Sequence, residues 1–282
     1  MPHNDRIRTE QAVADHYAAV SPNHRVYDGL RAAGVDMANL DVDSLAPVDE
    51  FHIRGREATI ELAEALTLDA TTHVLDVGCG IGGSARYLSE QYGCRVTGID
   101  LTAEYCELAN RLSQDVGLGE LNTFRQASAL ELPFADASFD VVWTEHAQMN
   151  IADQRGFYSE MVRVLRPGGV IAFHDMFGGD GGQVVYPTPW ASDAASSFLY
   201  PADDLRGLLS SFGLSVEHWV DCSAVSTTWF RAVSDKIAAH GPPAVGVNLL
   251  MGDDAGVKVA NGANGFESGA IVAIQAILRK PA

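Results

Sequence analysis

The feature that most constrains the fold is a short glycine-rich segment that follows an apolar stretch. Residues 73–77 read His-Val-Leu-Asp-Val, and glycines follow at positions 78, 80, 82 and 83. The apolar residues suit a buried central strand of a parallel sheet. The glycines omit side chains where a ligand approaches the backbone closely. Helical composition begins at Ser84, so the segment predicts a strand, a turn and a helix N-terminus whose free N–H groups face an adenine nucleoside.

A second apolar strand, residues 95–99, ends at Asp100, about twenty residues further on, where an acidic residue can bind a ribose diol. Two cofactor classes fit this layout. The glycines at positions 78, 80 and 83 satisfy the dinucleotide fingerprint G-x-G-x-x-G of a dehydrogenase. Asp76 favours the other class, because a carboxylate near the turn suits a ligand with an ammonium and a sulfonium and would repel a pyrophosphate.

Further motifs follow in a fixed order. The stretch from Asp76 to Gly82 reads D-x-G-x-G-x-G and resembles the first motif of the class I S-adenosylmethionine-dependent methyltransferases. Leu-Pro-Phe at 132–134 with Phe-Asp-Val-Val at 139–142 resembles that family's entry into its fourth strand, and Leu-Arg-Pro-Gly-Gly at 165–169 resembles the turn before its fifth. The resemblance is clearest over residues 71–175. It implies an enzyme of the methyltransferase class with S-adenosylmethionine as its cofactor.

The alternation of strand and helix patterns predicts a doubly wound, Rossmann-like α/β fold with a seven-stranded, mostly parallel sheet and an N-terminal helical cap. We expect a cap over residues 1–70 and a core over 71–282. Residues 176–200, rich in glycine, proline and aromatic residues, are expected to form a lid within the core. The acidic stretch 36–47 is expected to be a loop. Strands are expected near 73–77, 95–100, 122–127, 139–143, 170–175, 214–220 and 270–279.

The resemblance assigns cofactor contacts residue by residue. Asp76 and the glycines Gly78, Gly80 and Gly82 would line the methionine part, Asp100 would hold the ribose hydroxyls, and Leu101 would pack on adenine. Ser128 stands where many relatives have an aspartate that contacts the adenine amino group, with Ala129 and Leu130 beside it. A strand-end capping role is the alternative for Ser128. Glu145, at the end of the fourth strand, completes the predicted cofactor contacts.

The end of the fourth strand also carries the predicted catalytic residue. Glu145, His146 and Asn150 gather polar groups where ligands of such sheets sit. His146 is the candidate to take a proton from the methyl acceptor or to orient it, since a histidine can accept a proton near neutral pH. The alternative is a loop histidine that only orders the turn. His174 ends the fifth strand and is expected to face the same cleft.

The predicted substrate-binding residues come from several segments. The stretch 47–59 resembles small-molecule methyltransferases of the sarcosine/dimethylglycine type, in which the N-terminal helix and this loop close over the methionine moiety. Transfer to an amine nitrogen of an amino acid is therefore the first hypothesis. A similarity to the ubiquinone-methylating group keeps C- or O-methylation of a phenolic, sugar or quinone-like acceptor open, and a non-catalytic cofactor-binding protein is the third alternative. The residues expected to contact the substrate are Tyr17, His52, Asn150, His174, Trp190 and Tyr200.

The composition of the chain limits the classes of binding partner that we expect. The net charge of −18 argues against nucleic acid or an anionic membrane as a partner. No apolar run approaches the length of a membrane span, and the charged N-terminus is unlike a secretory signal, so a cytoplasmic protein is expected. The four cysteines form no C-x-x-C pair, so no metal is expected. The sequence leaves the oligomeric state open, with a homodimer as one option.

Overall fold

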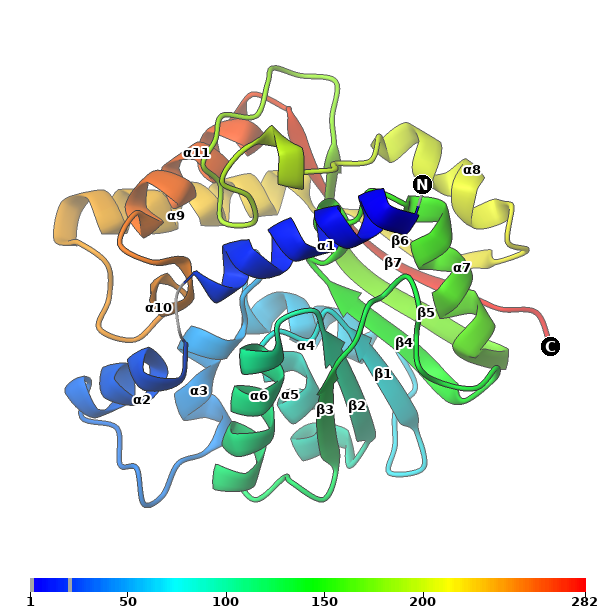
Figure 1. Ribbon diagram of the computed structural model, residues 1–282, viewed down its shortest axis with the longest axis horizontal. Helices are drawn as coiled ribbons and strands as arrows, with labels where there is room; N and C mark the ends of the chain where they lie inside the picture. The colour runs from blue at the N-terminus through cyan, green and yellow to red at the C-terminus, as the bar shows by residue number, and fades with distance from the viewer. Residues whose placement is uncertain (1–2, 20–21) are drawn as a thin grey trace.

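A single seven-stranded sheet forms the centre of the molecule. The computed structural model describes residues 3–19 and 22–282. The strands lie in the order β3-β2-β1-β4-β5-β7-β6, and β7 alone runs antiparallel to its two neighbours. This confirms the predicted doubly wound, Rossmann-like sheet (Figure 1). The strands are β1 (His73–Val77), β2 (Arg95–Asp100), β3 (Asn122–Gln126), β4 (Phe139–Glu145), β5 (Leu165–Gly178), β6 (Ser215–Asp221) and β7 (Ile271–Arg279).

Helices cover both faces of the sheet, and the alternation of side chains along β1 shows how. Val74 points to the face that packs on α4 (Arg56–Glu64), α5 (Gly83–Tyr92) and α6 (Ala103–Asp115). Leu75 and Val77 belong to the opposite core, which includes residues of α7 (Gln154–Val164) and α8 (Ala202–Ser210). Because both faces of β1 are buried, the strand reads as a nearly continuous apolar run.

The segment before β1 is helical, and one of its helices was not expected. It contains α1 (His3–Ala18), α2 (Pro22–Ala32), α3 (Val42–Asp49) and α4. The expected loop over 36–47 is wrong from residue 42 onward. Asp41 caps α3 by accepting a hydrogen bond from the Ser44 N–H at 2.8 Å, and Leu45 and Val48 are fully buried. The acidic residues that suggested a loop thus include a helix N-cap. Residues 1–2 and 20–21 of the predicted cap lie outside the described residues.

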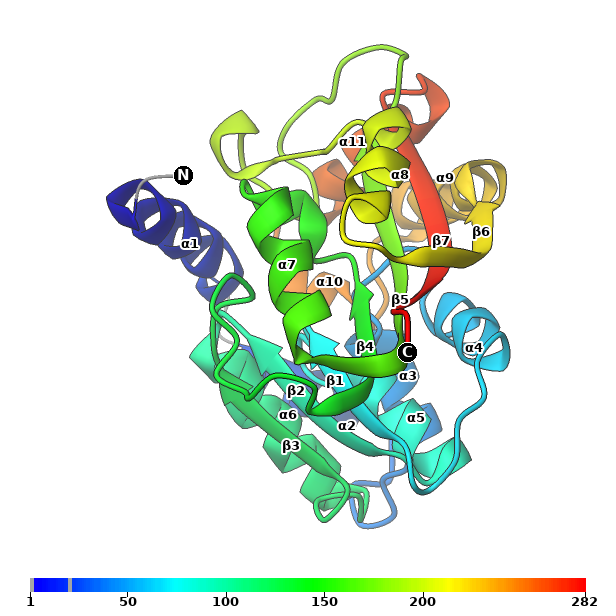
Figure 2. The same ribbon diagram turned by 90° about the vertical axis from the view of Figure 1, so that its right-hand side faces the viewer.

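Three helices separate β6 from β7: α9 (Ser223–His240), α10 (Asn248–Met251) and α11 (Ala255–Glu267). The glycines of α11 allow close packing. A Cβ atom at Gly262 would lie 2.1 Å from the Phe230 ring of α9, so any larger side chain would push these helices apart. Figures 1 and 2 show α9 and α11 side by side beyond the antiparallel end of the sheet.

Residues 179–200 are irregular except for the short 3-10 helix η2 (Ala194–Ser196), as expected. Residues 176–178 of the expected irregular segment 176–200 instead continue β5. Residues 179–200 lie next to α1, with which η2 makes direct contacts (Figure 1).

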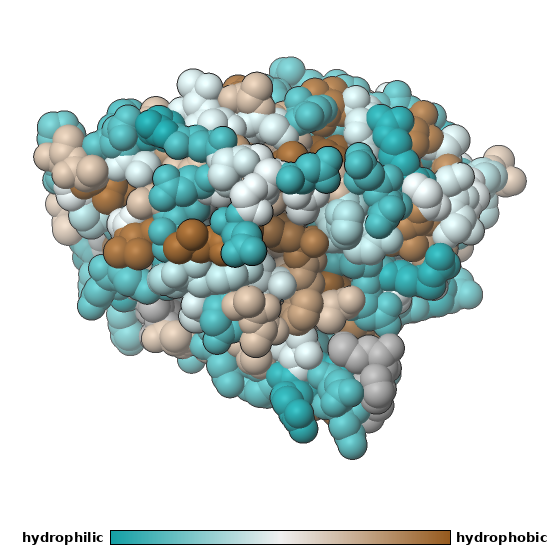
Figure 3. Space-filling model, turned by 90° about the horizontal axis from the view of Figure 1, so that it is seen from above, coloured by the Kyte–Doolittle hydropathy of each residue, from teal (hydrophilic) through white to brown (hydrophobic). Residues whose placement is uncertain are grey.

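The face seen in Figure 3 mixes hydrophobic and hydrophilic residues. Val185 and Val257 are among the exposed large apolar side chains of the molecule. Among the described residues, no helix combines the length and the apolar character needed to cross a membrane. The division into cap, core and lid stays a prediction.

Candidate functional site

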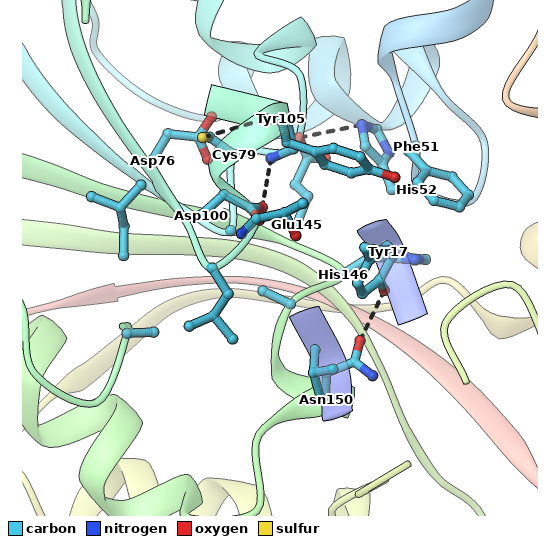
Figure 4. Close-up of a pocket in the computed structure, with 18 of the residues that line it drawn as sticks. Tyr17, Phe51, His52, Asp76, Cys79, Asp100, Tyr105, Glu145, His146 and Asn150 are labelled. Atoms are coloured by element: carbon cyan, nitrogen blue, oxygen red, sulfur yellow. Dashed lines mark hydrogen bonds and ion pairs between the residues drawn. The ribbon is translucent and has the colours of Figure 1, made fainter. Parts of the chain in front are cut away.

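A cavity opens at the carboxyl ends of β1, β2 and β4. This is the edge of a doubly wound sheet where ligands bind. Helix α1 contributes Val13 and Tyr17 to the wall, and the segment between α3 and α4 contributes Phe51 and His52 (Figure 4). The cavity is therefore built by the sheet and closed by the N-terminal helices.

The glycine turn and Asp100 form one side of this cavity. The Gly80 N–H donates to Asp100 Oδ2 at 3.1 Å, and the Thr102 N–H donates to Oδ1 at 2.8 Å. A Cβ atom at Gly80, whose φ is +52°, would meet nothing within 4 Å, so the backbone is open to a ligand there. Burial raises the pKa of Asp100 to about 6, although these N–H donors lower it. Asp100 is thus held rigidly as an acceptor for hydroxyl groups.

A network of acidic groups lies next to the glycine turn, where Ser84 at the start of α5 contacts Glu145. Glu145 Oε2 accepts hydrogen bonds from Ser84 Oγ at 2.7 Å and from Trp143 Nε1 at 3.0 Å. His52 Nε2 lies 2.8 Å from Glu50 Oε2 and 3.5 Å from Glu145 Oε2. Burial lowers the pKa of His52, but the two carboxylates outweigh burial and raise it to about 9. Burial and the carboxylates of Glu145 and Glu50 raise the pKa of Asp76 well above its ordinary value.

His146 has an unusual backbone conformation. Its φ is +51°, in the left-handed region that a non-glycine residue seldom adopts. The strained turn is held by its N–H, which donates to the carbonyl of His174 at 3.1 Å. Burial, and then the neighbouring His174 and His52, lower the pKa of His146 well below its ordinary value. The Nε2 atom is buried and has no partner among the described residues. Strain of this kind clusters at functional sites.

A second cavity adjoins the first. Four residues line both cavities: Tyr17, Phe51, His52 and His146. Beyond them the second cavity is almost wholly apolar, and it reaches from the end of β4 to the helices between β6 and β7. The residues that line only this cavity are Ile53, Met149, Met176, Pro189, Trp190, Trp229, Phe230, Val247 and Met251.

Most of the predicted site residues line these cavities. The first cavity includes eight of the predicted cofactor or catalytic positions and three of the predicted substrate positions, and the second adds one more. The cofactor and catalytic positions in the first cavity are Asp76, Gly78, Gly80, Asp100, Leu101, Ala129, Glu145 and His146. The substrate positions in the first cavity are Tyr17, His52 and Asn150, and the second cavity adds Trp190.

Five predicted residues lie outside the cavity walls. Gly82 packs against the Phe124 ring, and Leu130 and Tyr200 pack against the core on the α7 side of the sheet. The Ser128 hydroxyl instead donates a hydrogen bond to Glu10 of α1 and accepts one from the Leu130 N–H at 3.0 Å. His174 is fully buried behind Glu145.

Sequence reasoning missed several wall residues. Ser84 and Cys79 belong to the glycine segment, and Tyr105 follows Asp100 on α6, so their positions could have been inferred from neighbouring motifs. Met176, Met251 and Phe230 carried no local signal, because they come from β5, α10 and α9 and meet around one cavity only in the folded chain.

The described residues also contain one group that could hold a metal ion, although the sequence gave no reason to expect one. Ligand atoms of His52, Glu145 and His174 all lie within 4.8 Å of one another. These residues come from the loop before α4, from β4 and from β5, so only the folded chain assembles them.

The fold and the site together define a nucleoside-binding α/β protein of the Rossmann-like type, with an acidic residue at the end of β2 and a glycine turn after β1. Comparison with known proteins narrows this class. Residues 75–173 match a family model described as a methyltransferase domain. An O-methyltransferase of Aspergillus nomiae, rstn1, is 32% identical over 179 residues, which cover 61% of this chain and 77% of that protein. The chain therefore belongs to the S-adenosylmethionine-dependent methyltransferases, as its motifs predict.

Other similar proteins differ in the atom that they methylate. The glycine/sarcosine/dimethylglycine N-methyltransferase of Actinopolyspora halophila is 33% identical over 134 residues, 48% of this chain and 24% of that protein. The crystal structure of a geranyl diphosphate C-methyltransferase from Streptomyces coelicolor has a TM-score of 0.69 at 18% identity, with 96% of this chain and 98% of that chain covered. Several curated relatives are matched over only about a quarter to a half of their own length, from 26% to 48%.

Proposed function

We propose that this protein transfers a methyl group from S-adenosylmethionine to a small molecule whose body is apolar and whose acceptor is a phenol-like hydroxyl or an adjacent acidic carbon. The observation that carries this proposal is the second cavity, which is apolar along its walls and meets the first cavity at His52 and His146. A cofactor in the first cavity and an acceptor in the second would meet there.

The first cavity supplies the groups that an adenosyl cofactor requires. Asp100 would accept hydrogen bonds from the ribose hydroxyls, and the open backbone at Gly80 would lie along the methionine part. Asp76 and Glu145 lie on the side where the cationic ammonium and sulfonium would bind. The cofactor supplies an activated methyl group, so these residues mainly hold it in line with the acceptor.

His146 is the residue proposed to act on the acceptor. It lines both cavities and its Nε2 atom has no partner among the described residues. A ring nitrogen there could accept a hydrogen bond from the acceptor hydroxyl and then its proton, as the methyl group moves from sulfur to oxygen or carbon. The strained backbone at His146 fixes the ring at this junction.

An amine acceptor, the first hypothesis from sequence, has one specific observation in its favour. The junction is bordered by aromatic rings, among them Tyr17, Phe51 and Trp190, and ring faces attract cationic amines. The apolar depth of the second cavity nevertheless suits a larger uncharged body, because burying apolar surface there contributes about 25 cal/mol per Å².

Methylation of an acceptor panel tests the proposal. The panel should pair each apolar phenol or quinol with an amine of matched size, and should include glycine, sarcosine and dimethylglycine. Mass spectrometry would detect the methylated product and S-adenosylhomocysteine. We expect turnover with the apolar hydroxyl acceptors. Turnover restricted to the amino acids would overturn the assigned acceptor class while leaving the methyltransferase assignment intact.

A further inference from the structure

Three histidines surround Glu145 at the junction of the two cavities. The ring centres of His146 and His174 are 5.2 Å apart, those of His52 and His146 are 5.9 Å apart, and those of His52 and His174 are 6.2 Å apart. His174 Nδ1 lies 3.9 Å from Glu145 Oε1. His174 and Glu145 are buried, and the side chain of His52 is 5% exposed.

Several polar atoms of this cluster have no hydrogen-bond partner among the described residues. They include both ring nitrogens of His174, Nδ1 of His52 and Oε1 of Glu145. An unsatisfied buried polar atom costs about 1–3 kcal/mol, and such atoms in a native protein call for an explanation such as a bound ion or water. A single bound ion could serve Oε1 of Glu145, one nitrogen of His52 and one nitrogen of His174, because an imidazole binds a given ion through one nitrogen; the other His174 nitrogen would still lack a partner.

The ion pairs within the cluster do not supply that partner. His52 interacts through Nε2 with Glu50 and with Oε2 of Glu145. Ser84 and Trp143 also donate to Oε2 of Glu145. These contacts leave Oε1 of Glu145 and both ring nitrogens of His174 without a hydrogen bond among the described residues, although Oε1 and Nδ1 lie 3.9 Å apart.

We propose that His52, Glu145 and His174 form a binding site for one divalent transition-metal cation. Ligand atoms of these three residues lie within 4.8 Å of one another, a spacing that one ion could bridge after small side-chain adjustments. Two imidazoles and one carboxylate favour Mn²⁺, Fe²⁺, Co²⁺ or Zn²⁺ over Mg²⁺ or Ca²⁺, which prefer oxygen ligands alone.

Neighbouring side chains support this arrangement. Metal-binding histidines usually interact through the other ring nitrogen with a carboxylate, which fixes the ring. Glu50 holds Nε2 of His52 at 2.8 Å, and this nitrogen also faces Glu145 at 3.5 Å. Nδ1 has no hydrogen-bond partner among the described residues, so a metal would bind one of the two nitrogens and leave the other for Glu50. The donors to Oε2 of Glu145 likewise leave Oε1 for the metal. Two of the metal-binding residues, His52 and Glu145, also line the cofactor cavity. The coordination positions that the protein leaves open would therefore face the cofactor or the methyl acceptor.

The location suggests a role that rests on the proposed function. A cation at this junction would lie close to the place where the acceptor hydroxyl meets the cofactor, and it would help to hold that oxygen. The binding site itself does not depend on this role, so it is tested without cofactor or acceptor.

Titration of the untagged, chelator-treated protein with Co²⁺ is the direct test, since visible absorption reports the ligands of bound Co²⁺. We expect one equivalent to bind with a new visible band, and Zn²⁺ to compete for it. His174→Ala and Glu145→Gln should each weaken binding by about tenfold or more. His73→Asn is the matched control, because His73 is half-buried on β1 and contacts Thr97 instead; it should bind as the wild type does.

Three results would overturn the proposal: no binding of Co²⁺, Zn²⁺, Mn²⁺ or Fe²⁺ to the wild type, unchanged binding in both ligand variants, or a crystal structure with ordered waters at the cluster after soaking with metal. Circular dichroism checks the folding of each variant, and His174→Asn replaces the alanine variant if that one does not fold. Cofactor affinity measured in chelator tests the proposed function separately, so the two can fail independently.

Discussion

The hydroxyl of Tyr17 on α1 donates a hydrogen bond to Oδ1 of Asn150, just after β4, at a distance of 2.9 Å (Figure 4). The amide of Asn150 in turn donates to the carbonyls of Trp190 and Ser196. One asparagine thus joins the N-terminal helix to the irregular segment 179–200, and Tyr17 lines both cavities. This bond holds α1 over the place where a cofactor would bind.

Tyr17→Phe should weaken cofactor binding by about 0.5–1.5 kcal/mol, because it removes one neutral hydrogen bond and keeps the ring that packs on Phe51 and Tyr105. Calorimetry with S-adenosylhomocysteine would measure the change. Tyr92→Phe, on α5 and outside both cavity walls, is the control.

Hydrogen exchange should show that bound S-adenosylhomocysteine protects α1 and residues 179–200 in the wild type. Equal exchange with and without this ligand would remove the lid role from both segments.

Cofactor affinity should depend on the ionisation of Asp100. Its pKa of about 6 in the free protein means that the carboxylate is increasingly protonated below that pH and loses acceptor capacity for the ribose hydroxyls. Affinity should therefore fall as the pH drops below about 6 and level off above it. Asp100→Asn should weaken binding at neutral pH by about 1–3 kcal/mol and flatten this dependence. Asp76, Tyr17 and Tyr105 also face Asp100, so the wild type and Asp100→Asn are compared over the same pH series.

The stability of the free protein should change with pH in the opposite direction to the cofactor affinity. The folded-state pKa of Asp100 lies above its ordinary value of 3.8, so its contribution to stability is complete below 3.8 and is lost as the pH rises through about 6. Urea unfolding without cofactor should then show the wild type losing stability relative to Asp100→Asn over that range. A constant difference between the two proteins would contradict the raised pKa.

His146→Ala should lower turnover about a hundredfold or more if the ring takes the acceptor's proton, and should change the melting temperature little. His146→Gln should recover part of the rate if the ring only orients the acceptor, because an amide can hydrogen-bond but cannot take the proton. Steady-state rates on an accepted substrate and a thermal melt separate these outcomes. A folded His146→Ala protein with normal turnover would return His146 to a structural role.

Arg86→Leu should destabilise the fold by about 3–5 kcal/mol, because it removes the hydrogen-bonded partner of the buried Asp49 carboxylate and leaves only Arg56, at 4.0 Å from Asp49. Arg86 is fully buried and donates to Asp49 Oδ2 at 2.7 Å and to the Ile81 carbonyl of the glycine turn at 2.8 Å. Arg95→Leu, at an exposed position on β2, is the control and should change stability by less than about 0.5 kcal/mol. Urea denaturation would measure both, and equal midpoints would show that the buried pair contributes nothing.

Short sequence patterns determined the central part of the fold and the cofactor edge of this protein. The apolar run 73–77, the glycines after it and Asp100 predicted the central strands and the cofactor edge, because parallel strands and their turns leave strong patterns over a few residues. Tertiary structure decided what lies around that edge. Ser128 was predicted from its motif to contact adenine, yet its hydroxyl binds Glu10 of a helix more than a hundred residues earlier in the chain. The apolar second cavity and the cluster of His52, Glu145 and His174 each draw side chains from separate elements. Contacts of this range leave no period or spacing in the sequence, since they exist only once the sheet and its helices have packed.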